Sequence, residues 1–392
     1  MAVPLSGSAP SVTAVQPTSI RRWRRARLVV MPLAALLVLV AAILGGVGWY
    51  FSDQLLHVTH AQKPYTLHVT AAGVNTVTLQ RTRDTARPGT FGLGWPGGHA
   101  VVGVILKEDG SSVTRRLTGK MTGLAAGVSV RLDASVYAGN PGTLGLRYTD
   151  VAVPDPLGPM PAWYLAGRRS TWVIEVHGYN SSRLEGLRVA PALTTLGLPV
   201  LDLSYRNDVG APPSPDGLYH LGATEWQDVE AGVRYALTHG AHDVILYGWS
   251  MGGGTVESFL HRSAYAPRVR AVVLDAPALD WNAVLDLQGR ERHLPGVLIA
   301  VAQRIVAAWL GMSDLAPIDQ VRAAGSLTAL TLLFHGDEDT VVPVGSSDAF
   351  ARARPDIVTY RRVAGADHTQ AWNVAPTAYT ATLTTFLTRE PR

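Results

Sequence analysis

The stretch that decides the fold is residues 243–254, which reads DVILYGWSMGGG. Its first part is an apolar run, which predicts a strand buried on both faces of a sheet. The segment from Gly248 to Gly252 then follows the pattern G-x-S-x-G, and further glycines lead into a helical stretch. Glycine at both flanking positions allows a very tight turn between strand and helix without a side-chain clash. The sequence therefore predicts that Ser250 projects from a strained turn at the edge of a sheet.

On either side of this stretch, apolar runs alternate with helical segments from about Leu144 to the C-terminus. One helical segment is residues 224–238, where apolar side chains recur at three- and four-residue steps. Strand–helix alternation of this kind predicts an α/β fold with a mostly parallel, doubly wound sheet, whose chemistry lies at the carboxyl ends of the strands. The runs expected to form strands are Thr171–His177, Leu198–Ser204, Asp243–Gly248, Val269–Asp275, Leu327–His335 and Ile357–Val363.

A serine hydroxyl becomes a good nucleophile only when a base accepts its proton. In a fold with this turn the base follows the serine in the chain. His261 lies in the helix directly after the turn, and His293 lies in an inserted segment. His368 lies in the polar loop Gly365-Ala366-Asp367-His368 after the last strand, where it can reach back to Ser250. We therefore expect His368 to be the base.

Several carboxylates could orient that histidine. Asp339 is favoured because it lies in a short polar loop after the strand that ends at His335. Asp275 is the alternative, because it ends the strand that follows the Ser250 helix. Asp337 is closer to the strand end and is expected to support the turn. Asp367 adjoins the histidine, and adjacent residues rarely orient each other's side chains well.

Acyl transfer at a serine also needs two backbone N–H donors for the oxyanion. We expect one to be the amide of Met251, directly after the nucleophile. The other is assigned to Tyr179, in the loop that follows the strand ending at His177. His177 precedes Ser250 and ends a buried strand, so we expect it to support this loop rather than to act as the base.

Taken together, these motifs resemble the α/β-hydrolase superfamily, and are similar to its serine aminopeptidase and BEM46-like branches. The landmarks are His177-Gly178-Tyr179, Gly248-Trp249-Ser250-Met251-Gly252-Gly253, His335-Gly336-Asp337-Glu338-Asp339 with Val342-Pro343, and Gly365-Ala366-Asp367-His368. The resemblance covers residues 144–392 and implies a triad of Ser250, Asp339 and His368. Residues 53–143 have no counterpart in the simple members of the family, and the loop Tyr205-Arg206-Asn207-Asp208 replaces a more glycine-rich one.

About 50 residues separate the strand ending at Asp275 from the one starting at Leu327. Because connections in compact domains are usually far shorter, this segment is expected to have structure of its own. Residues 294–310 are strongly apolar with helical spacing. They predict either a helical cap over residues 278–324 or an ordinary core helix, and an apolar cap would favour acyl or other hydrophobic substrates.

The N-terminal region predicts attachment to a membrane. Residues 1–27 are expected to form a disordered basic tail, and five arginines lie between Arg21 and Arg27. Residues 28–51 carry no charge and are long enough to cross a bilayer. The arginines predict that the tail stays in the cytoplasm and that everything after Phe51 lies outside it. A cleaved signal peptide is the alternative, but its apolar region is usually shorter and ends in small residues.

Between the membrane segment and the hydrolase-like region, residues 53–143 contain short runs rich in Val and Thr and broken by Gly or Pro. They predict a small β-rich segment without a recognisable chemical motif. The chain has no cysteine, which excludes disulfides and thiolate chemistry, and the concentration of arginine beside the apolar run argues against nucleic-acid binding. Scarce lysine with abundant Ala, Gly, Pro and Arg is typical of a GC-rich bacterial source.

The sequence thus predicts a membrane-anchored serine hydrolase that cleaves an ester, thioester or amide in a small acyl or peptide substrate. Such chemistry needs no metal or organic cofactor. The alternative is a membrane-tethered binding or scaffold protein with the same fold and no catalysis, which a complete triad argues against.

Overall fold

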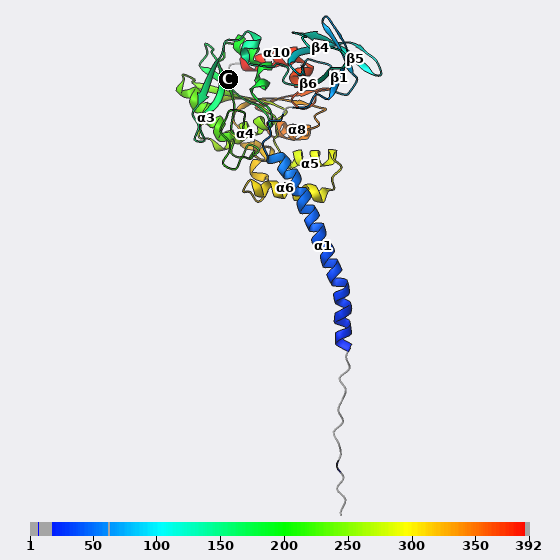
Figure 1. Ribbon diagram of the computed structural model, residues 1–392. Helices are drawn as coiled ribbons and strands as arrows, with labels where there is room; N and C mark the ends of the chain where they lie inside the picture. Colours follow the sequence, from blue (N-terminus) through cyan, green and yellow to red (C-terminus); the bar gives the residue numbers. More distant parts are fainter. Residues whose placement is uncertain (1–6, 8–17, 62, 389–392) are drawn as a thin grey trace, which may run out of the picture.

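The computed structural model describes residues 7, 18–61 and 63–388, and a single long helix precedes the folded domains. This helix, α1, extends over Thr18–Leu56 and projects away from the rest of the molecule (Figure 1). Residues 30–56 form a stretch apolar enough to cross a membrane, and its most apolar window is not buried by the protein. The helix begins ten residues before the expected start at 28 and ends five after the expected end at 51. The expected tail therefore overlaps the helix, and the rest of that tail lies almost entirely outside the described residues.

The next domain is a closed β-barrel. Its strands are β1 (Leu67–Gly73), β2 (Thr76–Gln80), β3 (Phe91–Trp95), β4 (Gly98–Glu108), β5 (Ser112–Thr118) and β6 (Ser129–Asp133), hydrogen-bonded in the order β1-β2-β5-β4-β3-β6. Inward-facing apolar side chains such as Val77, Leu93 and Trp95 are almost completely buried. The expected β-rich segment is present, and closing it into a barrel pairs the strand edges.

The remainder of the chain is built on one large sheet. Its strands are β7 (Thr149–Val153), β8 (Met160–Leu165), β9 (Thr171–Val176), β10 (Val200–Leu203), β11 (Asp243–Trp249), β12 (Val269–Asp275), β13 (Leu330–Gly336) and β14 (Val358–Val363), in the order β14-β13-β12-β11-β9-β10-β8-β7. All neighbours from β10 to β14 are parallel, whereas β8 pairs antiparallel with both β7 and β10. The predicted α/β fold with a mostly parallel sheet is confirmed.

Helices cover both faces of this sheet, which explains why its central strands are almost continuously apolar. One face packs against α2 (Ala190–Thr195) and α10 (Pro376–Thr388). The other face packs against α3 (Trp226–Thr238), α4 (Met251–Arg262) and α8 (Val344–Ala353). The short helices α7 (Gln320–Ala323) and α9 (Ala371–Val374) belong to connecting segments.

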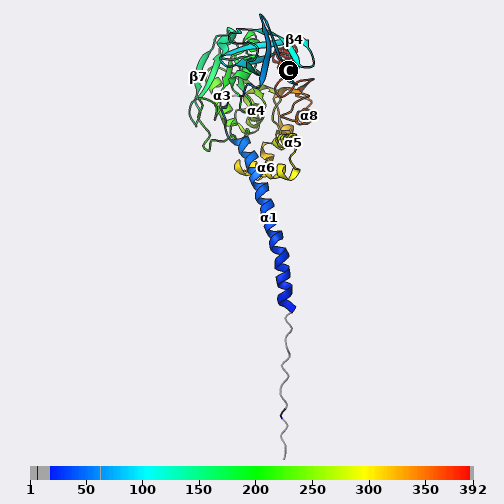
Figure 2. The same ribbon diagram turned by 45° about the vertical axis from the view of Figure 1, so that its right-hand side comes forward.

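The inserted segment between β12 and β13 contains α5 (Trp281–Glu291) and α6 (Gly296–Trp309). Figures 1 and 2 show these helices beside the C-terminal end of α1, between its projecting part and the sheet. The contact is close at Gly48, where an added Cβ would lie 2.9 Å from Val301 Cγ1. Ser52 Oγ also donates a hydrogen bond to the Ala302 carbonyl (3.3 Å). The end of α1 is therefore packed into the fold.

Candidate active site

Ser250 lies at the turn between β11 and α4, in the backbone conformation that the sequence predicts. Its φ and ψ are 50° and −120°, a strained region for a residue with a side chain. A Cβ on Gly252 would lie 2.1 Å from the Val176 carbonyl oxygen, and one on Gly248 would lie 2.6 Å from Gly253 Cα. Only glycine fits at these two positions, so the pattern allows the turn to bring Ser250 to the carboxyl edge of the sheet.

His368 and Asp339 form a hydrogen-bonded chain with this serine. His368 lies in the loop between β14 and α9, and its Nε2 is 2.8 Å from Ser250 Oγ. Its Nδ1 is 2.8 Å from Asp339 Oδ2, and Asp339 lies in the loop after β13. The structure therefore brings together the serine, histidine and aspartate singled out in the sequence, in the geometry that passes a proton from serine to histidine.

Asp339 is held as an ionised carboxylate. Its side chain is fully buried, and Oδ1 accepts hydrogen bonds from the amides of Val341 and Val342 (2.8 Å each). Oδ2 also lies 3.1 Å from Nε2 of His335. Burial alone would raise the pKa of Asp339, but attraction to His368 and hydrogen bonds from both histidines hold that pKa well below its ordinary value. His335, in β13, therefore contacts the acid from the side opposite in sequence to His368.

The electrostatic environment of His368 predicts how activity depends on pH. Burial lowers the pKa of His368, whereas nearby carboxylates, above all Asp339, raise it. The carboxylates together outweigh burial, so the pKa of His368 lies above the ordinary 6.5. A protonated imidazole cannot accept the serine proton, so kcat/KM should fall as pH drops through this raised pKa. In a pH profile of kcat/KM on a soluble ester, the midpoint should lie above 6.5. In Asp339→Asn the midpoint should shift to lower pH, because the main cause of the raised pKa is removed. A wild-type midpoint at or below 6.5 would contradict this expectation.

The competing carboxylates have other partners. Asp275 Oδ2 accepts a hydrogen bond from the Tyr379 hydroxyl (3.0 Å), and the Asp275 carbonyl accepts one from the Ser250 amide (3.0 Å). Burial raises the pKa of the Asp275 carboxyl to about 6. Asp337 accepts a hydrogen bond from the Gly365 amide (2.8 Å), which supports the turn as expected. Asp275 thus supports the serine turn through its backbone.

The two amides assigned to the oxyanion come from segments next to the serine. Met251 begins α4, so its N–H is one of the unpaired donors at a helix N-terminus. The loop with Tyr179 is close to the serine, because a Cβ on Gly178 would lie 3.0 Å from Ser250 Cβ. Within the described part of the chain, neither the Met251 nor the Tyr179 amide donates to another protein group. His177 pairs with Asp208 (2.7 Å) and stacks on Tyr205, which stabilises this loop.

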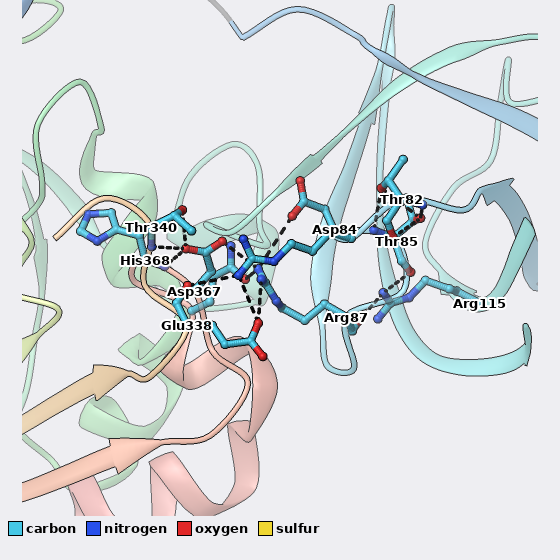
Figure 3. Close-up of polar contacts among 11 residues, drawn as sticks. Thr82, Asp84, Thr85, Arg87, Arg115, Glu338, Thr340, Asp367 and His368 are labelled. Carbon is cyan, nitrogen blue, oxygen red and sulfur yellow. Dashed lines mark hydrogen bonds and ion pairs between the residues drawn. The ribbon is translucent and has the colours of Figure 1, made fainter. Parts of the chain in front are cut away.

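Two residues without a predicted role, Asp367 and Arg87, lie on the barrel side of His368 (Figure 3). Asp367 Oδ1 accepts hydrogen bonds from the amides of His368 (2.8 Å) and Thr340 (3.0 Å). Its Oδ2 accepts one from Nη1 of Arg87 (3.2 Å), which comes from the barrel loop between β2 and β3. No sequence motif marks Arg87, because its partner is 280 residues away. The only indication of a role in the sequence is that Asp367 directly precedes the predicted base, His368.

Two cavities meet at Ser250 and His368. The larger, of about 720 Å³, is lined mostly by polar residues from the barrel and from the Tyr179 loop, among them Lys63, Arg131, Asp133 and Glu185. The smaller, of about 330 Å³, is lined mostly by apolar residues of α5, α6 and the end of α1. We call these the polar chamber and the apolar chamber. The inserted helices therefore form one wall of the site, which favours the cap interpretation over an ordinary core helix.

Among the residues that the structure describes, no His, Cys, Asp and Glu side chains cluster in a way that could hold a metal ion. The arrangement at Ser250 supplies a nucleophile, a base, an orienting acid and backbone donors.

Comparison with known proteins supports a hydrolase. Residues 215–388 match the prolyl oligopeptidase family, and residues 66–133, the barrel, match a domain of unknown function, DUF8805. An esterase of Pyrococcus furiosus, Pf2001, has 21% sequence identity and a TM-score of 0.52, and the match covers 64% of this chain and 94% of that one. A predicted CIB-like hydrolase of Thermoplasma acidophilum has 16% identity and a TM-score of 0.45, covering 62% and 99%. No curated protein matches the chain. The fold is that of the α/β-hydrolases.

Proposed function

We propose that this chain, a serine hydrolase of the α/β-hydrolase superfamily, cleaves carboxylic esters with Ser250, His368 and Asp339 as its triad. The observation that carries the proposal is the chain of two 2.8 Å hydrogen bonds from Ser250 through His368 to the buried Asp339. This chain of contacts contains the nucleophile, the base and the orienting acid of acyl transfer, and the amides of Met251 and Tyr179 are the proposed oxyanion donors. A binding or scaffold protein would not need a serine in strained backbone geometry with an aligned base, so catalysis is favoured over that alternative.

In the first step Ser250 Oγ attacks the ester carbonyl carbon, and its proton moves to His368 Nε2. The carbonyl oxygen becomes an oxyanion that the Met251 and Tyr179 amides stabilise. The C–O bond to the alcohol then breaks, and the alcohol leaves with the proton from His368. Water, deprotonated by the same histidine, attacks the acyl-serine, which releases the carboxylic acid and restores Ser250. Asp339 orients His368 and stabilises the imidazolium in both halves.

The apolar chamber favours an ester over a peptide. Trp281, Val284, Leu285 and Ile299 lie along it and offer no hydrogen-bond acceptors for a backbone amide. Gln54, Gln288 and Arg292 also line the chamber, but an amide group of an extended peptide that lies against its apolar side chains would lack a partner, at a cost of about 1–3 kcal/mol for each group. The match to the prolyl oligopeptidase family makes a peptidase the second candidate.

A paired substrate panel separates the two. We expect the purified full chain to hydrolyse p-nitrophenyl acyl esters with a kcat/KM well above that for aminoacyl p-nitroanilides of matched size. A higher kcat/KM for the anilides would assign a peptidase. Absence of turnover on both, with no covalent labelling by a fluorophosphonate, would favour the non-catalytic alternative.

We also propose that α1 is an uncleaved, single-pass anchor in a bacterial cell membrane with the hydrolase domain outside the cytoplasm. The support is the packing of its last turns: Leu56 is fully buried, and its carbonyl accepts a hydrogen bond from the Tyr219 amide (2.8 Å). Cleavage after Phe51 would leave Leu56 in place but would remove the contact of Gly48 with Val301 and that of Trp49 with Trp309, whose ring centroids are 6.1 Å apart. The protein should stay in the membrane pellet through high-salt and carbonate washes, and external protease should reach its hydrolase domain. A shortened, freely soluble product would instead indicate a signal peptide.

A further inference from the structure

The last turns of α1 form part of the apolar chamber. Phe51, Gln54 and Leu55 line it together with side chains of α5 and α6, and Ser250 and His368 lie at its inner end. The backbone carbonyl of Gln54 also accepts a hydrogen bond from the Tyr179 hydroxyl (3.2 Å). Tyr179 is the residue whose backbone amide we assign to the oxyanion. The membrane helix therefore contacts the active site directly and contributes to its walls.

The chamber begins where the exposed apolar surface of α1 ends. Large apolar side chains are exposed along α1 from Val30 to Tyr50, and Trp49 and Tyr50 are 52% and 54% exposed. Aromatic residues of this kind mark the boundary between the hydrocarbon core and water. Val297, in the first turn of α6, is also 56% exposed, and α6 lies beside the C-terminal part of α1 (Figures 1 and 2). The apolar chamber thus lies at the level of the membrane surface, and the polar chamber lies between the barrel and the sheet.

We propose that the apolar chamber takes the long acyl chain of an ester dissolved in the bilayer, while the polar chamber takes its alcohol part. This rests on the proposed esterase function and specifies its substrate. Each chamber matches one part of an amphipathic ester, and both reach Ser250. Every methylene that becomes buried should raise kcat/KM about four-fold, because its transfer from water contributes about 0.8 kcal/mol.

The first experiment varies chain length with p-nitrophenyl esters from acetate to dodecanoate, below their critical micelle concentrations. We expect kcat/KM to rise with length until the chamber is full. Leu285→Trp, which fills the chamber, should lower kcat/KM for dodecanoate at least ten-fold and leave acetate within two-fold. Leu287→Trp is the matched control, because Leu287 lies on the same helix but not along the chamber, and it should change neither.

The outcomes separate this inference from the proposed function. A kcat/KM that is flat or falls with chain length, while short esters are hydrolysed, would overturn the acyl chamber and leave the esterase intact. An equal loss for acetate and dodecanoate in Leu285→Trp would also overturn it. Absence of hydrolysis at every length would instead reject the esterase.

A second experiment tests delivery from the bilayer. The full chain is reconstituted in phosphatidylcholine vesicles that contain 4-methylumbelliferyl oleate, or in vesicles mixed with a separate population that carries this ester. We expect release of the fluorophore to be at least ten-fold faster when protein and ester share one bilayer. Equal rates in the two arrangements, or hydrolysis of the butyrate ester without any of the oleate, would overturn the membrane source.

A separate observation assigns a role to the barrel. Its loop of residues 81–90 is fixed from inside by Arg115, which donates hydrogen bonds to the carbonyls of Thr85 (3.1 Å), Arg87 (2.8 Å) and Gly89 (2.7 Å). This loop places Arg87 against the catalytic loops, and Arg87 is only 5% exposed there. Arg87 donates to Asp367 and also to Gln370 Oε1 (2.7 Å), as Figure 3 shows for the Asp367 contact.

Asp367 connects the loops that carry the base and the acid. Its Oδ1 accepts hydrogen bonds from the backbone of His368 and from both the amide and the hydroxyl of Thr340, the residue after Asp339. The arginine fixes the other carboxylate oxygen. We infer that Arg87 is a positioning residue, through which the barrel keeps His368 and Asp339 in register with each other.

Arg87→Ala should therefore lower kcat about 10- to 100-fold with little change in KM, since displacements of about 1 Å can cost 10²-fold. Arg87→Lys should restore part of kcat, because lysine keeps the charge. Arg83→Ala is the matched control: Arg83 is 55% exposed and pairs with Glu338 but does not contact Asp367, so its removal should leave kcat within two-fold.

Circular dichroism and the thermal midpoint accompany each variant. If Arg87→Ala does not fold, Asp367→Asn replaces it, because this change removes the anion that Arg87 contacts and keeps an oxygen acceptor. A well-folded Arg87→Ala, or in its place Asp367→Asn, with the kcat of Arg83→Ala would overturn the positioning role. A loss that appears only as a higher KM would overturn it as well.

Discussion

Ser250→Ala is expected to lower ester turnover by about 10⁵- to 10⁶-fold, because no other group can form the acyl intermediate. The serine contributes one hydrogen bond to His368 in the resting state. Its removal should therefore change the free energy of unfolding by only about 1 kcal/mol. Alanine keeps the Cβ that the turn already accommodates, so the backbone strain at φ 50° is unchanged.

The measurement is kcat on a p-nitrophenyl ester, with circular dichroism to confirm folding. Ser263→Ala is a suitable control, because Ser263 caps the other end of the same helix and bonds Glu230. It should retain nearly full turnover. A Ser250→Ala enzyme that keeps more than about 1% of wild-type kcat would place the nucleophile elsewhere, since loss of a catalytic serine costs several orders of magnitude.

Asp339→Asn is expected to lower turnover by about 10⁴-fold, whereas Asp275→Asn should lower it far less. Asparagine presents an N–H₂ or a neutral oxygen to His368 Nδ1, so it neither holds the productive tautomer nor stabilises the imidazolium. Asp275 makes its side-chain contact with Tyr379 and supports Ser250 only through its backbone carbonyl, which the substitution leaves in place.

Comparing kcat of the two purified variants on one ester decides between these acids. The pair is well matched, because both carboxylates are buried at the ends of neighbouring strands, β12 and β13. Thermal unfolding of each variant separates loss of structure from loss of chemistry. If Asp275→Asn loses most of its kcat and Asp339→Asn keeps most of it, the acid assignment is wrong.

The sheet and the serine turn could be predicted because their signals are local. A buried strand, two glycines that only a tight turn requires and a following helix all lie within residues 243–254. The candidates for the base and the acid could be limited to a few loops, because every strand of a parallel sheet ends at the same edge. Position in the chain alone therefore selected His368 and Asp339 for the contacts that the structure now gives them.

What the sequence did not reveal depends on contacts between distant segments. The sequence predicted short strands but not their closure into a barrel. The role of Arg87 depends on a loop that Arg115 holds from inside the barrel. The helix α1 extends past the predicted membrane segment, residues 28–51, at both ends. At its C-terminal end, packing against α6 and the bond between Leu56 and Tyr219 extend the helix past the apolar run. Apolar patterning reports membrane thickness and carries no information about such tertiary contacts.

The central claim is that a single activated serine, Ser250, attacks the substrate. Its most direct test is to label the purified chain with a fluorophosphonate and to identify the modified residue by peptide mass spectrometry. The account predicts one adduct, on Ser250, whose formation slows strongly in Asp339→Asn and is lost in Ser250→Ala. An adduct on another residue, or a folded wild-type protein that hydrolyses esters without any adduct on Ser250, would contradict it.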